Sequence, residues 1–228
     1  MTDVNIAITT GIGADTYFRS TVPNGNYGTA VVLAFINGVR KGLLRFDLSG
    51  IPSTAICTAA VLKFYANSIG ANTVFDVYKI TDANGDWVEG TYDAGGAENG
   101  SPCWNKKKYN TVDWAGSAGL QTAGTDYVNT VIATGSAASG IASGTLISIT
   151  FNAAGLAVLQ DWFGDATNNG LLVVTDVSNT ISVHSGEATT EAYRPVLAIS
   201  YTEATTGGTE VLNANIFESE ILNSRIVR

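Results

Sequence analysis

The chain has 228 residues, of which 45% are hydrophobic and only 14% charged, and its formal net charge is −8. This length fits one large domain, or one domain with an appendage, and the hydrophobic fraction is ample for a core. The acidic balance excludes an electrostatic footprint for nucleic acid or anionic membrane, and no apolar run approaches the roughly 18 residues of a membrane-spanning helix.

The beginning of the chain has no basic n-region followed by an apolar h-region, so we expect no secretory signal there. Two cysteines, Cys57 and Cys103, could pair, but we expect both to be free in a chain with so large a core. The one compact basic run, 106–108, is interpreted as a solvated loop and not as a binding patch.

Short apolar or alternating runs, separated by clusters of Gly, Asn, Asp, Ser and Pro, predict β-strands along most of the chain. In the run 73–80, both faces carry apolar side chains, as expected of a sandwich strand that is partly covered on its outer face. The predicted strands are 31–36, 43–48, 59–66, 73–80, 145–151, 170–176 and 195–202.

One segment has helical spacing. Leu156, Leu159 and Phe163 recur at helical intervals within 152–163, and Asn152 is a suitable N-cap, so we predict a single short helix there.

Residues 115–144 are rich in Gly, Ala and Ser and predict long loops. Many short strands, one helix and no alternation of strands with helices predict an all-β protein, an antiparallel β-sandwich of the jelly-roll type. We expect residues 1–202 to form this domain, with a flexible linker at 203–208.

The final segment, 209–228, repeats with a period of five: TEVLN, ANIFE, SEILN, SRIVR. Each block starts with a small or hydroxylic residue and has Val or Ile in third place. One such coil cannot bury its own interior, so we interpret this C-terminal β tail as an assembly device that needs a partner surface; a plain β-hairpin is the alternative and needs one too. The predicted assembly residues are Val211, Ile216, Phe217, Ile221, Leu222 and Ile226.

Three motifs carry a family resemblance: LLRFDLSGIP at 43–52, the W-x-E-G of 87–90 and RPVLAISYT at 194–202. Over about 14–202 the chain resembles the DNRLRE-type β-sandwich family, which is similar to carbohydrate-binding modules, and the tail resembles pentapeptide repeats. The resemblance implies a non-catalytic module, often appended to enzymes or surface proteins and sometimes binding polysaccharide. In LLRFDL, we expect the three apolar side chains Leu44, Phe46 and Leu48 to share one face.

The residues of an enzyme are missing from the sequence. His184 is the one histidine, its neighbour Ser185 would point to the opposite face of a strand, and there is no G-x-S-x-G elbow. One histidine and two distant cysteines cannot supply a zinc site. We therefore expect no catalytic residues and no metal ligands of this kind.

Acidic pairs could in principle hydrolyse a glycoside, and two are near each other in sequence: Glu187 with Glu191, and Asp86 with Glu89. Any acidic chain offers such pairs, so we expect a protein that is not an enzyme.

No cofactor is expected, although calcium stays open at one place. Asp82, Asn84 and Asp86 have the spacing of oxygen ligands, but the glycine of an EF-hand loop is misplaced and its final Glu is missing. An ordinary hairpin turn explains the run D-A-N-G-D at least as well.

Aromatic residues concentrate between 87 and 127, where a sugar face could stack on an exposed ring. We expect Trp87 and Trp104 to anchor loops in the core. The candidate carbohydrate-binding residues are Tyr109, Trp114 and Tyr127.

Two functional hypotheses follow. The first is a non-enzymatic structural protein of a large particle, in the manner of a bacteriophage virion (head decoration, fibre or tail accessory), displayed on the particle surface and held by its tail to other subunits or to itself. The alternative is a carbohydrate-binding module of an extracellular or cell-surface protein, with glycans as partners. Neither hypothesis involves nucleic acid or a membrane.

Overall fold

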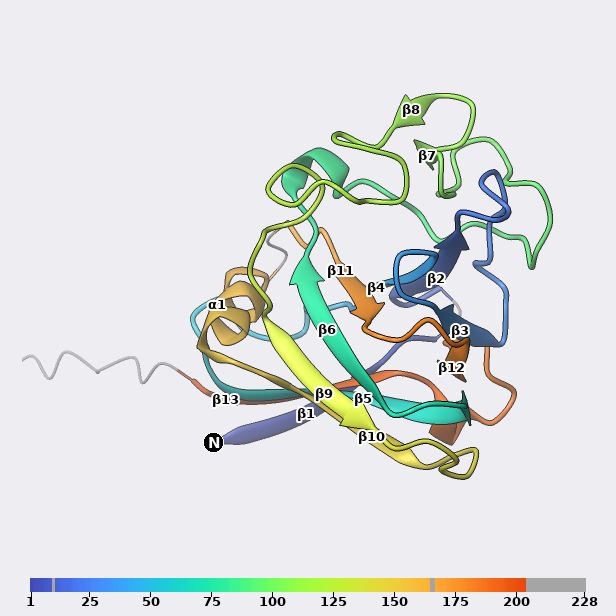
Figure 1. The fold of residues 1–228 in the computed structure, drawn as a ribbon. Helices are drawn as coiled ribbons and strands as arrows, with labels where there is room; N and C mark the ends of the chain where they lie inside the picture. Colours follow the sequence, from blue (N-terminus) through green and yellow to red (C-terminus); the bar gives the residue numbers. More distant parts are fainter. Residues whose placement is uncertain (10, 165–166, 204–228) are drawn as a thin grey trace, which may run out of the picture.

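The computed structural model describes residues 1–9, 11–164 and 167–203. Its strands form a strongly curled, wholly antiparallel sheet in the order β1-β13-β5-β10-β9-β6-β11-β4-β2, with β12 pairing both β5 and β3 (Figure 1). The sheet passes from one layer to the other where β10 pairs β9, so its two halves face each other across the core. The predicted all-β, antiparallel sandwich with one short helix is confirmed within these residues.

The strands and helices of the described part have the following bounds: β1 Thr2–Ala7, β2 Ala14–Arg19, β3 Val32–Phe35, β4 Arg40–Arg45, β5 Ile56–Ile69, β6 Thr73–Lys79, η1 Asp82–Asn84, β7 Lys106–Lys108, β8 Val112–Asp113, β9 Ala133–Ala137, β10 Leu146–Phe151, α1 Ala153–Asp161, β11 Leu171–Thr175, β12 Ile181–His184, η2 Glu191–Tyr193 and β13 Val196–Thr202.

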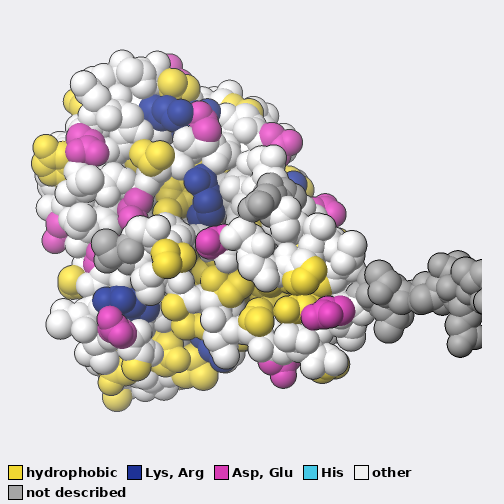
Figure 2. Space-filling view, turned by 180° about the vertical axis from the view of Figure 1, so that it is seen from behind, with side chains coloured by type: hydrophobic (Ala, Val, Ile, Leu, Met, Phe, Trp, Pro, Cys, Tyr) yellow, Lys and Arg dark blue, Asp and Glu magenta, His cyan; other side chains and the backbone are white. Residues whose placement is uncertain are grey.

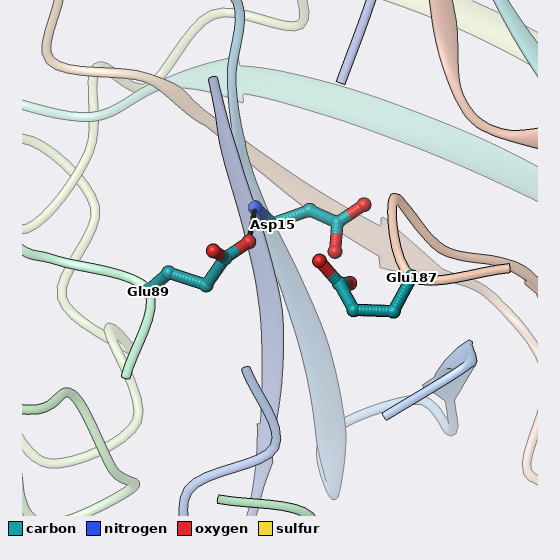
Figure 3. Close-up of side chains that lie close together, drawn as sticks. All are labelled: Asp15, Glu89 and Glu187. Carbon is teal, nitrogen blue, oxygen red and sulfur yellow. Dashed lines mark hydrogen bonds between the residues drawn. The ribbon is translucent and has the colours of Figure 1, made fainter. Parts of the chain in front are cut away.

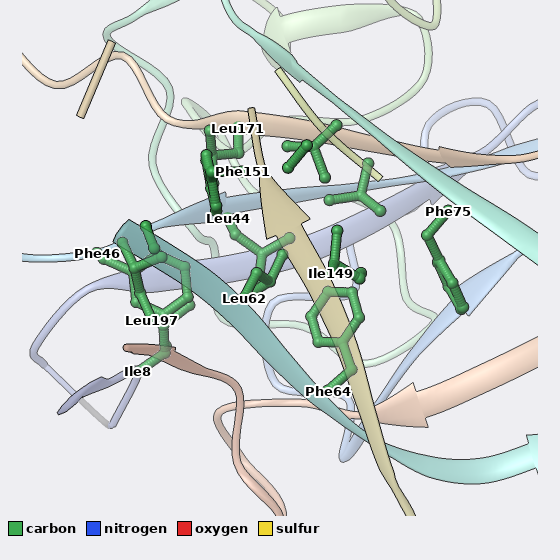
Figure 4. Packing of buried hydrophobic residues seen from close by; sticks show 14 of the residues in the cluster. Ile8, Leu44, Phe46, Leu62, Phe64, Phe75, Ile149, Phe151, Leu171 and Leu197 are labelled. Atoms are coloured by element: carbon green, nitrogen blue, oxygen red, sulfur yellow. The ribbon is translucent and has the colours of Figure 1, made fainter. Parts of the chain in front are cut away.

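The main core lies between the two layers (Figure 4). At its centre Phe75 meets the rings of Phe35 and Phe64 edge-on, with ring centroids 5.6 and 5.9 Å away, an arrangement that aromatic quadrupoles favour. The expected alternation in LLRFDL is confirmed, because Leu44, Phe46 and Leu48 are all buried in this core. Burial of such side chains is the main source of stability in a sandwich.

The predicted helix is α1, which packs on β5 and β10 beside the core. Asn152 caps it as expected: its side-chain oxygen accepts a hydrogen bond from the backbone N–H of Gly155 at 3.0 Å. Leu159 and Phe163 are buried in the main core, while Leu156 packs against it from a half-buried position. The helical spacing read from the sequence therefore describes the buried stripe correctly.

The prediction of loops throughout 115–144 is wrong at β9, the strand that connects the two layers. Its sequence, ATGSA, has no bulky residue that would indicate a strand. Gly135 is needed there because a side chain would collide with the backbone of Ser148 on β10. Because β9 lies so close to β10, it has small residues in place of the bulky ones that usually predict a strand.

Strands β1, β2 and β12 were not predicted either, nor was the small β7–β8 hairpin. In β2 the polar residues Asp15 and Thr16 interrupt the apolar pattern, yet both are buried because β2 is covered on each face. Cys57 and Cys103 are both free, as expected.

The linker beyond 203 and the period-five tail, 209–228, lie outside the described residues, and so do all six predicted assembly residues. A helix with the length and apolar character needed to cross a membrane is absent from the part of the chain that the structure describes. On the face seen in Figure 2, acidic and basic side chains are scattered and no large area carries a single sign.

Candidate functional site

Residues 81–132, called the cap below, fold over the outer face of the sheet and enclose a second, smaller core (Figure 1). This core lies between the cap and the outward side chains of β2, β4 and β11, and tryptophans dominate it. Its buried members are Ala14, Phe18, Leu43, Ile80, Trp87, Trp104, Trp114, Leu120 and Leu172.

Trp114 is therefore not a sugar platform, and that prediction is wrong. Its side chain is only 4% exposed, and its indole Nε1 donates to the carbonyl oxygens of Cys103 at 3.0 Å and Trp104 at 3.1 Å. A ring that is covered on both faces has no surface on which a sugar could stack. Trp87 and Trp104 are buried loop anchors, as expected; Trp87 Nε1 donates to the carbonyl oxygen of Asn169 at 2.9 Å.

The other two predicted aromatic residues are half-buried and lie apart. Tyr127 packs edge-on against Tyr78 of β6, with ring centroids 4.9 Å apart. Tyr109 follows β7 and is fixed by backbone hydrogen bonds with Ser101 and Gly100; it forms no aromatic pair with the described residues. The structure thus joins Tyr127 to a partner that the sequence did not single out for binding, and leaves Tyr109 separate.

Beyond the Tyr78–Tyr127 pair, the outer face of the sheet is open. Register places Asp76 beside Thr134 of β9 and Val174 of β11, and the Thr134 hydroxyl donates to Asp76 at 3.0 Å. One pair further along β6, Val74 lies beside Ser136 and lines a shallow groove of about 410 Å³. We call this strip of β6 and its neighbours, 74–78 with 134–136 and Val174, the open face.

The side chains of Asp82, Asn84 and Asp86, where the sequence left calcium open, bind three different partners: Asp82 accepts from Asn169, Asn84 donates to Asp126 and Asp86 pairs with lysines. Calcium at this run stays a prediction. Asn84 is fully buried and donates to Asp126, while its oxygen accepts from the backbone N–H of Ala115 at 2.9 Å. The run forms the 3-10 turn η1, so the hairpin turn that was the other interpretation of this run is wrong.

Asp86 instead forms ion pairs with Lys107 at 2.7 Å and Lys108 at 2.5 Å, and hydrogen bonds from these two lysines lower the pKa of Asp86 to about 2. Lys107 is buried and also donates to the carbonyl oxygen of Ala83 at 2.6 Å. The basic run is therefore part of how the cap is fixed, and the interpretation as a wholly solvated loop is wrong for Lys107.

A different acidic cluster is present, which we call the carboxylate triad: Asp15, Glu89 and Glu187 (Figure 3). Asp15 comes from β2, Glu89 from the start of the cap and Glu187 from the loop after β12. One carboxylate oxygen of each residue lies within 4.8 Å of the other two. Glu89 also accepts a hydrogen bond from the backbone N–H of Asp15 at 2.7 Å, and Asp15 accepts one from that of Gly186 at 2.7 Å.

The triad has unusual acid–base properties because Asp15 is buried and Glu89 and Glu187 are half-buried. Burial, with the adjacent Glu187 carboxylate as a second cause, holds the pKa of Asp15 well above its ordinary value. Burial likewise raises the pKa of Glu89 to about 7 and raises the pKa of Glu187. Such a cluster either retains protons or neutralises its charge with a cation.

The sequence contained the members of the triad but not their grouping. In the sequence, Glu89 is near Asp86 and Glu187 is near Glu191, and no motif marks Asp15. In the structure both of those partners are engaged elsewhere: Asp86 with lysines and Glu191 with Arg194 at 3.5 Å.

His184 has a serine neighbour that the sequence did not indicate. Its Nε2 lies 3.2 Å from the hydroxyl oxygen of Ser143, while Ser185 is buried and donates to the carbonyl oxygen of Ala30. Among the described residues no carboxylate forms a hydrogen bond with the His184 ring, so the third member of a hydrolytic triad is not found there.

The family model of carbohydrate-binding module family 96 matches residues 7–130, more than half of the chain, and the chain belongs to this family. A search of curated proteins gave no match. This finding supports the alternative functional hypothesis, a non-catalytic carbohydrate-binding module, over the structural role in a virion, for which neither the fold nor the comparisons provide support. The more specific resemblances, to DNRLRE-type domains and to pentapeptide repeats, stay predictions.

Proposed function

We propose that this protein is a non-catalytic module that binds a glycan on the open face, with the Tyr78–Tyr127 pair as its stacking platform. The observation that carries the proposal is the match to carbohydrate-binding module family 96, which spans both the cap and the strands β2 to β6 beneath it.

The chemistry of the open face fits this ligand class. Sugars present apolar C–H faces that pack on aromatic rings, and hydroxyl groups that exchange hydrogen bonds with polar side chains. Tyr78 and Tyr127 are half-buried, so each is held in place by the second core and still has an exposed part. Thr134 and Ser136 are exposed, and Asp76 lies between them and Val174.

The open face is also long enough for more than one sugar ring. From Tyr78 to Val74 the strand advances four residues, about 13 Å at the usual rise of an extended chain. A linear glycan lying along β6 would reach from the tyrosine pair to the groove beside Val74 and Ser136.

Binding of the full chain to a panel of plant, algal and bacterial polysaccharides, by affinity electrophoresis and then calorimetry on the responding polymer, tests the proposal. We expect Tyr78→Ala and Tyr127→Ala each to weaken binding at least tenfold, because each loses one stacking surface. Tyr92→Ala is the matched control, since Tyr92 is 43% exposed on the cap, outside the open face.

Two results would contradict the proposal. Absence of binding to every polysaccharide argues against the function itself. Binding that survives both tyrosine variants but is lost in Tyr92→Ala leaves the function in place and moves the site from the open face to the cap.

A further inference from the structure

The carboxylate triad forms no direct ion pair within the described part of the chain. None of the ion pairs formed there includes Asp15, Glu89 or Glu187. Arg194 is the cation that acts on the triad, since burial raises the pKa of Glu187 and the charge of Arg194 acts to lower it, but Arg194 donates to the carbonyl oxygen of Ala188 and its ion pair is with Glu191. Three acidic side chains thus share the influence of one neighbouring cation, Arg194, which itself pairs with Glu191.

Two features beyond the acidic character of the cluster indicate that a ligand is required. Oε2 of Glu187 is completely buried and receives no hydrogen bond, which is costly for a carboxylate oxygen. Asp15 is only 1% exposed; its Oδ2 accepts a hydrogen bond from Gly186, and its carboxyl group also shares a hydrogen bond with that of Glu187. Buried carboxylates in proteins are normally paired with a base or coordinate a metal.

We infer that Asp15, Glu89 and Glu187 bind a divalent cation, and that this cation is calcium. Calcium takes oxygen ligands at about 2.3–2.6 Å, so the oxygens around one ion lie within roughly 5 Å of one another. The triad meets this condition, since its three oxygens lie within 4.8 Å. In Figure 3 the carboxylates of Asp15 and Glu187 point toward each other and that of Glu89 approaches from the opposite side of β2.

The donor set decides the choice of ion. All three donors are carboxylate oxygens, whereas zinc prefers the nitrogen and sulfur of His and Cys. Magnesium requires a near-ideal octahedron and retains several waters, and it suits a buried set of ligands from three separate chain segments less well than the more adaptable calcium does.

The position of the triad gives the ion a structural role. Asp15 lies on β2, at one end of the strand order, Glu89 begins the cap, and Glu187 belongs to the loop after β12 in the other part of the sheet. The ion therefore joins three segments that are distant in sequence; Asp15 and Glu89 alone are 74 residues apart. It acts as a cross-link between the cap and both layers, and this inference does not depend on glycan binding.

The competing state is a cluster that retains protons instead of binding metal, and the test separates the two. The full chain is stripped with EDTA, dialysed, and its thermal unfolding is followed in CaCl2, MgCl2 or MnCl2, with calorimetric titration of CaCl2. At calcium about 100-fold above its Kd we expect the unfolding midpoint to rise by roughly 5–10 °C.

Glu187→Gln and Glu89→Gln provide the variants, because an amide keeps the shape of the carboxyl group but loses its charge. We expect both to abolish the calcium-induced shift, while Asp113→Asn, an exposed acid on β8 that pairs with Lys106, retains it. Should Glu187→Gln fail to fold, Glu89→Gln carries the test, since Glu89 is half-buried and lies on a different segment of the chain.

Three outcomes overturn the inference. The first is that the unfolding midpoint and the titration show no response to any of the three ions. The second is that calcium raises the midpoint of the triad variants as much as that of the unchanged chain. The third is that the midpoint responds to manganese or magnesium but not to calcium, which removes the assignment to calcium.

Discussion

The ring of Trp114 in the cap lies 5.7 Å from the ring of Phe18 on β2, and this contact attaches the cap to the outer face of the sheet. The indole also donates to two backbone carbonyl groups within the cap, so a single side chain fixes both the internal shape of the cap and its position. Removal of this side chain should therefore affect stability more than any local feature of the loop.

We predict that Trp114→Ala lowers the free energy of unfolding by about 3–5 kcal/mol, because it leaves a large cavity in the second core and removes the indole donor from the carbonyl oxygens of Cys103 and Trp104, of which Trp104 keeps the backbone N–H of Gly119. Urea unfolding measures this loss. Tyr109→Ala, at a half-buried position of the same cap outside the second core, should lower it by less than about 1 kcal/mol. Equal effects of the two substitutions would show that the cap is not fixed through Trp114.

Asp126 is the second point at which the cap is fixed. It is fully buried, and its carboxylate accepts hydrogen bonds from the backbone N–H groups of Gly116, Ser117 and Thr122 and from the side chain of Asn84. Because bonds to a charged acceptor contribute about 1.5–3 kcal/mol each, we expect Asp126→Ala to lower the free energy of unfolding by roughly 3 kcal/mol or more.

Hydrogen exchange gives the sharper measurement for Asp126→Ala. The amides of Gly116, Ser117 and Thr122 should lose protection selectively, whereas those of the main-core strand β5 should keep theirs. Uniform loss across both regions would indicate a global effect instead of a local one.

Stability should depend on pH through Glu89. Its pKa is about 7 in the folded protein against an ordinary value of 4.5, so between these values the folded chain holds a proton that the unfolded chain has released. Stability in chelator-containing buffer should consequently fall as pH rises from about 4.5 to 7. The unfolding midpoint at pH 5 and pH 7.5 measures this, and Glu89→Gln should reduce the difference without abolishing it, because burial also raises the pKa of Asp15 and of Glu187. Asp86, with a pKa of about 2, affects stability only in more acidic solution and does not interfere.

Asn152→Ala should lower the free energy of unfolding by about 1 kcal/mol through loss of the N-cap of α1. Asn152→Ser should restore most of this, since serine caps helices equally well; guanidinium titration of the three proteins checks the order. An alanine variant as stable as the unchanged chain would mean that packing of Leu159 alone holds the helix.

The hydrophobic pattern of the sequence predicted strands and the helix correctly where the environment of a side chain depends mainly on its neighbours in the sequence. The alternation in 43–48, the strands near 59–66 and 195–202, and the helix after Asn152 were all predictable, because alternate side chains of a strand share a face and residues three or four apart share a helix face. The all-β class followed from these elements together.

The sequence by itself therefore determined the class of fold, the position of the helix and the absence of the usual catalytic motifs. Only the tertiary structure decided that Trp114 is buried, that Tyr127 pairs with Tyr78, and that the three acids of the triad meet. The reason is physical: exposure and charge balance depend on which distant segments come together, and the folding of the cap over the sheet brings residues 74 and more positions apart into contact. A periodicity within a few neighbouring residues carries no information about contacts between segments so far apart in the sequence.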